Sequence, residues 1–134
     1  MEKRKIRRLV IACLLVAFVL CSVPAALAAT VNYSSTFPRY QDHVTIISGQ
    51  KSSASSTTAT NTITGPSTAT EGYFWIDLVP GSNQISNKVR CEHGKTANIK
   101  YINNLSMTGT VYLRGHATNW DINTHEVSGI VDFG

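Results

Sequence analysis

The chain has 134 residues and a formal net charge of +4, from 12 Lys or Arg and 8 Asp or Glu residues. Five basic residues and one acid lie within the first eight positions, so residues 29–134 hold seven basic and seven acidic side chains. A surface that binds nucleic acid through its phosphates needs an excess of Lys and Arg on one face. The neutral balance of residues 29–134 therefore argues against a nucleic-acid partner.

The first 28 residues have the three parts of a cleavable secretory signal peptide. Residues 1–8 are basic, residues 9–20 form an apolar run, and Ala26-Leu27-Ala28 supplies a small-x-small cleavage site. The apolar run is shorter than the roughly 20 residues that span a bilayer. We therefore predict a signal-peptide helix that is cleaved after Ala28, and a secreted, extracellular protein; an uncleaved anchor is the alternative.

Residues 29–134 have the length of one domain and a composition that favours strands. Val, Ile and Thr together number 31 in this part, whereas Leu numbers three and Ala six. Side chains branched at Cβ lose freedom in a helix and pack well on a pleated sheet. We predict a single all-β domain, most simply a small antiparallel β-sandwich, with a small β-barrel as the alternative. Only Cys91 remains after cleavage, so no intrachain disulfide is expected.

The first half of the domain has two strand candidates. Residues 43–48 carry Val44 and Ile46 at alternate positions and predict an early strand. In residues 52–70, twelve of the nineteen side chains are Ser or Thr, so this segment is either a flexible loop or a solvated edge strand. In a strand, one face would hold the four alternate threonines Thr58, Thr60, Thr62 and Thr64.

The second half alternates more clearly between apolar and polar positions. In residues 73–79, we expect the core-facing side chains to be Phe74, Ile76 and Leu78. The opposite, solvent-facing set is Tyr73, Trp75 and Asp77. Further strands are predicted over residues 85–92, 97–102, 111–116 and 127–133, with turns at His93-Gly94-Lys95 and Asn103-Asn104.

No motif for catalysis or metal binding appears in the sequence. The histidines lack the helical spacing of metal ligands, no Ser lies in a nucleophile elbow, and Asp121 and Asn123 have too few carboxylates nearby for a calcium loop. Cys91 falls on the apolar face of its strand, where a thiol is inert. We therefore predict a non-enzyme without catalytic residues, metal or cofactor. The four histidines are expected to be solvated: His43, His93, His116 and His125.

Aromatic side chains on the polar faces are the strongest indication of a binding site. Tyr73, Trp75 and Tyr112 fall on expected solvent faces, and Trp120 lies in a polar connection. Together they predict a platform for a sugar, a peptide or a membrane interface. The alternative is that some of them pack beneath the Ser/Thr-rich segment.

Two segments in the last third of the chain carry a resemblance to known proteins. They are residues 109–115, GTVYLRG, and residues 127–133, VSGIVDF. With the basic signal peptide and the Ser/Thr/Asn-rich remainder, this V-S-G-x-x-D ending resembles small exported proteins of unassigned function from Gram-positive bacteria. The resemblance covers about the last third of the chain and implies a bacterial secreted β domain. Some such proteins look like bacteriocin-like or accessory products, although the glycine- and tryptophan-dense pattern of lactococcin-type bacteriocins is absent here.

These observations favour a secreted, non-enzymatic β-sandwich that binds an extracellular ligand, which would be a cell-wall glycan, a protein or a membrane interface. The alternative function is a secreted bacteriocin-like antimicrobial or its immunity partner. A small hydrolase with a site assembled only in space is a third hypothesis.

Overall fold

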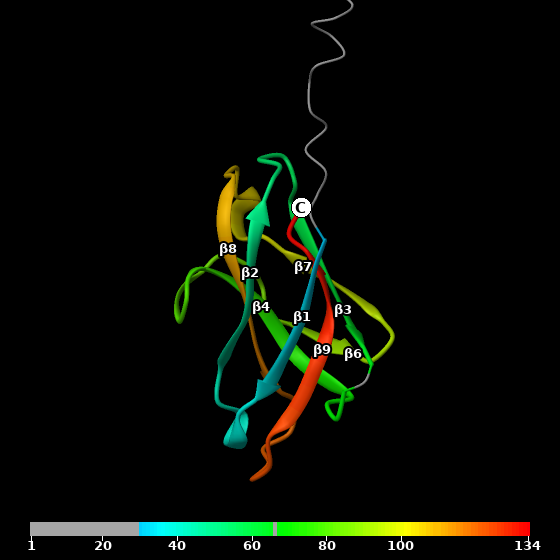
Figure 1. Ribbon diagram of the computed structural model, residues 1–134. Coiled ribbons are helices and arrows are strands. Elements are labelled where there is room, and N and C mark those ends of the chain that lie inside the picture. Colours follow the sequence, from blue (N-terminus) through cyan, green and yellow to red (C-terminus); the bar gives the residue numbers. More distant parts are fainter. Residues whose placement is uncertain (1–29, 66) are drawn as a thin grey trace, which may run out of the picture.

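The computed structural model describes residues 30–65 and 67–134, and the predicted signal peptide lies outside these residues. Within them, nine strands form two antiparallel sheets that pack face to face (Figure 1). The sheets do not close into a barrel, which confirms the predicted sandwich. None of the described segments is a helix long and apolar enough to cross a membrane.

The two sheets interleave distant parts of the chain. The four-stranded sheet has the order β1 (Thr30–Phe37), β9 (His125–Asp132), β3 (Thr58–Thr64) and β7 (Thr96–Lys100). The five-stranded sheet has the order β2 (Val44–Lys51), β8 (Gly109–Ala117), β4 (Glu71–Val79) and β5 (Ser82–Gln84), and β6 (Val89–Glu92) also pairs with β4. Two short 3-10 turns complete the fold, η1 (Arg39–Gln41) and η2 (Ile102–Asn104).

The core lies between the sheets and follows the predicted alternation. The inward side chains of β4, Phe74 and Ile76, are fully buried, as are Val127 and Val131 of β9. Burying side chains of this size stabilises the fold by about 1.5–3 kcal/mol each. The inner faces of both sheets therefore supply one continuous core, as expected for a sandwich.

The Ser/Thr-rich segment contains an interior strand, which corrects the edge-strand alternative. β3 lies between β9 and β7 and pairs with both. Its inward residues Ala59, Asn61 and Ile63 are buried, and its threonines lie on the opposite face. Ala59 and Ile63 are apolar and Asn61 is a buried polar side chain, so a strand of low overall hydropathy still packs in the middle of a sheet.

Two strand predictions needed correction. β1 was not predicted, because Tyr33 and Phe37 are its only large buried side chains and the residues between them are Ser and Thr. Of the predicted strand over residues 85–92, only Val89–Glu92 is a strand, and residues 82–84 form a separate strand before it. Between the two, the Oγ of buried Ser86 accepts a hydrogen bond from the backbone N–H of Ile76 at 2.7 Å. This side-chain bond replaces a ladder bond, and β5 and β6 are therefore separate strands.

The predicted turns are present. Gly94 has a φ of 75° and Asn103 a φ of 56°, so both adopt the left-handed conformation that these residue types tolerate. β2 also contains an irregularity between Thr45 and Ile47 in its pairing with β8. A bulge of this kind allows the adjacent residues Ile46 and Ile47 both to pack against the core.

Candidate functional site

The outer face of the five-stranded sheet carries the candidate site. Cross-strand pairs between β4 and β8 place polar and aromatic side chains opposite one another on this face. The pairs are Tyr73 with His116, Trp75 with Arg114, and Asp77 with Tyr112. The three residues of the predicted outward set of β4 therefore share one face, but Trp75 and Asp77 are buried on it rather than exposed to solvent.

A pocket of about 280 Å³ opens on this face, and we call it the outer-face pocket. Its volume is close to the lower end of the range for small-molecule sites, about 300 Å³. Its walls come from three parts of the chain that are distant in sequence: the residue before β2, the β4–β5 hairpin with the segment after it, and β8. The lining residues are His43 before β2, Trp75 and Asp77 on β4, residues 81–84 of the β4–β5 hairpin with Lys88 beyond it, and Arg114 on β8.

Trp75 forms the covered floor of the outer-face pocket. Its side chain is only 4% exposed, whereas the sequence predicted a solvent-exposed ring. The difference arises because Lys88 Nζ lies 4.3 Å from the centre of the Trp75 ring, and the His43 ring packs edge-on against it at 4.8 Å. A cation is attracted to the face of an indole ring, so the Lys88 ammonium lies over Trp75 and shields it from solvent.

Asp77 and Arg114 form a buried ion pair at one wall. Arg114 Nε lies 3.7 Å from Asp77 Oδ2, and their side chains are 13% and 4% exposed, respectively. Arg114 Nη1 donates to the hydroxyl of Thr45 at 2.8 Å, and Asp77 Oδ2 accepts the backbone N–H of Gly81 at 3.1 Å. These contacts fix the guanidinium and the hairpin loop relative to each other.

Two histidines stack beside the floor. The rings of His43 and His116 lie 5.2 Å apart and nearly parallel. His116 is 9% exposed, which corrects the expectation that it is solvated. Its Nδ1 pairs with the carbonyl of Ala117 at 2.6 Å, and Lys88 Nζ lies 3.4 Å from its Nε2. A lysine ammonium only donates, so these contacts assign the neutral tautomer with the proton on Nδ1.

The local charges disfavour protonation of both rings. Burial and, to a smaller extent, the charge of Lys88 lower the pKa of His116 below its usual value, against the opposing effect of the hydrogen bond to the Ala117 carbonyl. Burial and the charges of Lys88, His116 and Arg114 lower the pKa of His43. Near neutral pH, Lys88 and Arg114 are therefore the cations of the pocket and Asp77 its only anion.

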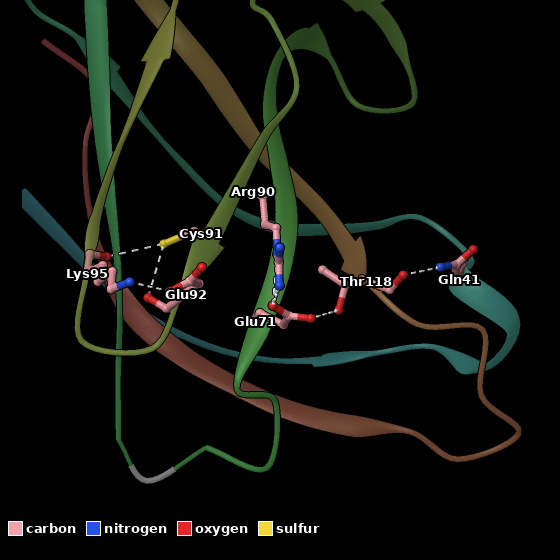
Figure 2. Close-up of polar contacts among 7 residues, drawn as sticks. All are labelled: Gln41, Glu71, Arg90, Cys91, Glu92, Lys95 and Thr118. Carbon is pink, nitrogen blue, oxygen red and sulfur yellow. Dashed lines mark hydrogen bonds and ion pairs between the residues drawn. The ribbon is translucent and has the colours of Figure 1, made fainter.

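A second, smaller hollow of about 110 Å³ lies at the end of the same sheet. Figure 2 shows the network beside it: Glu71 accepts hydrogen bonds from Arg90 and from the Thr118 hydroxyl, and Gln41 donates to the Thr118 carbonyl. The hydrogen bond from Arg90 is the main reason that the pKa of Glu71 is lowered. These hydrogen bonds occupy the Glu71 carboxylate. They link β4 to β6 and to Thr118, the residue after β8.

The candidate catalytic groups do not converge. Cys91 is 1% exposed, its Sγ lies 3.4 Å from the carbonyl oxygens of Asn61 and Lys95, and burial raises the pKa of its thiol. His125 pairs with Asp121 at 3.0 Å, but no hydroxyl or thiol bonds to a histidine ring within the described residues. In the same part of the chain, no three His, Cys, Asp or Glu side chains are grouped closely enough to hold a metal ion.

The four residues of the predicted aromatic platform are separated. Tyr73 and Trp75 both contact His116, and Tyr112 lies opposite Asp77 on the same outer face. Trp120 is 67% exposed in the β8–β9 loop and stacks on Tyr40 of η1 at 4.9 Å. The structure thus places three of the four residues on one sheet face and the fourth in a loop cluster.

Comparisons with protein-family models, with curated proteins and with solved structures each found no match for this chain. Three pocket residues were not predicted from the sequence: His43, Lys88 and Arg114. One signal was present for Arg114, because alternation places it on the same face of β8 as Tyr112 and His116, and these oppose the aromatic face of β4. No sequence pattern indicates that His43 and Lys88 approach Trp75.

Proposed function

We propose that this protein is a secreted, non-enzymatic binding domain that recognises an extracellular glycan in the outer-face pocket. The observation that supports this proposal is the combination of an aromatic floor with hydrogen-bonding walls in one concave site. A sugar ring has apolar C–H groups on its faces and hydroxyls at its edge. The exposed His43 ring, which packs against the covered Trp75, offers aromatic surface to the former, and Gln84 and Arg114 offer polar partners to the latter.

The site is also preorganised, which lowers the free-energy cost of binding. The Asp77–Arg114 pair holds one wall, and Gln84 Nε2 donates to the Ser86 carbonyl at 2.7 Å. Oδ1 of Asp77 is buried without a hydrogen-bond partner among the described residues. A buried polar atom without a partner is costly, and such atoms are frequent in sites that serve a function.

A binding experiment with matched variants tests this function. The purified protein is applied to immobilised cell-wall glycans and host glycoproteins, with lipid vesicles as a third surface. We expect glycan binding that weakens about tenfold in H43A/Q84A, because both side chains line the pocket and are exposed. The control N98A removes an exposed side chain from β7 of the other sheet and should bind normally. Absence of binding to all glycans, or equal binding by H43A/Q84A, would contradict the proposal.

A second candidate, membrane-active antimicrobial function, is favoured by one observation. Tyr40, Trp120 and Ile122 are large, exposed apolar side chains of the η1 and β8–β9 loops, and we call them the aromatic tip. The loops are joined by a hydrogen bond from Tyr40 N–H to the Asp121 carbonyl at 2.7 Å. Trp and Tyr favour the membrane–water interface. Under this function, the vesicle surface binds the protein, W120A abolishes that binding, and the protein inhibits bacterial growth.

A further inference from the structure

The charges of the outer-face pocket do not balance. Lys88 and Arg114 bring two positive charges to its walls and Asp77 brings one negative charge. Asp77 is committed to Arg114 and to the Gly81 N–H. Lys88 has no carboxylate within ion-pair distance among residues 30–65 and 67–134; its contacts are the Trp75 ring and His116 Nε2. One cation therefore faces the pocket without a charged partner.

The backbone places Lys88 there through an irregular segment. The Ser86 hydroxyl satisfies the Ile76 N–H and donates to the Asn87 carbonyl at 3.0 Å, which interrupts the strand between β5 and β6. Asn87 Oδ1 then accepts the Lys100 N–H at 2.7 Å, and this bond fixes the segment to β7. Two side-chain hydrogen bonds with the backbone thus hold the residue before Lys88, so the position of this lysine is built into the fold.

We propose that the outer-face pocket binds a sugar that carries a carboxylate, with Lys88 as the charge partner of that carboxylate. This inference rests on the proposed function. The single excess positive charge matches a monoanion better than a phosphate, which carries close to two charges at neutral pH. A sugar carboxylate bound in the pocket pairs with Lys88 Nζ, and the Arg114 guanidinium, which also lines the pocket, is a second donor group.

Tryptophan fluorescence provides a direct test. The chain has two tryptophans, so W120F leaves Trp75, beneath Lys88, as the only indole. In this background, glucuronic, galacturonic and N-acetylmuramic acids are titrated beside glucose, galactose, N-acetylglucosamine and glucose 6-phosphate. We expect at least one sugar acid to change the Trp75 emission and to bind about tenfold or more tightly than its neutral counterpart.

Two variants identify the charge partner. In K88Q, the affinity for the sugar acid should fall about tenfold more than the affinity for the neutral sugar. K100Q is the matched control, because it removes an exposed lysine from β7 on the other sheet. Affinity for the acid should also fall with rising salt, since the interaction is between partly exposed charges.

The outcomes separate the two proposals. Equal binding of acidic and neutral sugars, or an unchanged affinity in K88Q, overturns the carboxylate assignment and leaves glycan binding intact. Preference for glucose 6-phosphate over the sugar acids also overturns it. If no sugar in the panel binds the W120F protein or the wild-type protein, as measured by calorimetry, both the carboxylate assignment and the proposed function fail.

Discussion

Arg114 and Asp77 lie on neighbouring strands with Nε and Oδ2 3.7 Å apart, and both side chains are largely buried. Removing one partner leaves the other charge without compensation in the protein interior. We expect D77A to lower the free energy of unfolding by about 3 kcal/mol, measured by urea denaturation. D42A removes an exposed acid and should change stability by less than about 0.5 kcal/mol. A D77A protein as stable as the wild type would show that the pair contributes little.

The two tryptophans should differ sharply in their effect on stability. Trp75 is 4% exposed and packs against three side chains, whereas Trp120 is 67% exposed and touches Tyr40. We expect W75A to lower the free energy of unfolding by about 3 kcal/mol and W120A to lower it by less than about 1 kcal/mol, measured by thermal or urea unfolding. Similar losses in both variants would be inconsistent with the burial described above.

Gly129 should not tolerate a side chain. A Cβ at this position would lie 2.4 Å from the carbonyl oxygen of Thr62 and 2.4 Å from the Tyr33 hydroxyl. Because Thr62 belongs to the paired backbone of β3, the clash cannot be relieved by a side-chain rotation alone. We expect G129A to lower stability by about 2 kcal/mol or more, whereas S128A, one residue earlier on the partly exposed face of β9, should change it by less than about 0.5 kcal/mol. Equal stability of the two variants would refute this packing.

Stability should decrease as the pH falls below neutrality. Burial holds the folded-state pKa values of His43 and His116 below the usual histidine value of 6.5, so the unfolded chain binds more protons. The two neutral histidines contribute fully to the free energy of unfolding above pH 6.5, and this contribution is lost as the pH falls through their lower folded-state pKa values. We expect a smaller free energy of unfolding at about pH 5.5 than at about pH 7.5.

The variant H116Q isolates this effect. Glutamine can retain a hydrogen bond to the Ala117 carbonyl but does not titrate, so the decrease between the two pH values should be smaller than in the wild type. H93Q, at an exposed turn, should show the wild-type decrease. A wild-type decrease in H116Q as well would show that His116 is not responsible.

Sequence patterns predicted the fold class because strand alternation in β4, β8 and β9 follows directly from burial of one face. Sequence patterns failed where a polar side chain replaces backbone pairing, as at Ser86, and where a polar side chain is buried on the inner face of a strand, as at Asn61. The pocket was predicted only in part. Alternation placed Trp75 on the correct face, but the approach of Lys88 and His43 depends on tertiary structure that no local pattern encodes.

The strand order of the smaller sheet also constrains when the protein can fold. β9 lies between β1 and β3, so the first strand of the described residues pairs only with the last one to be synthesised. Until residues 125–132 have left the ribosome, β1 lacks its partner and β3 lacks one of its two partners. Such long-range pairing slows folding, because large loops must close first. The four-stranded sheet, and with it the closed core of the sandwich, therefore forms only after β9 has been synthesised.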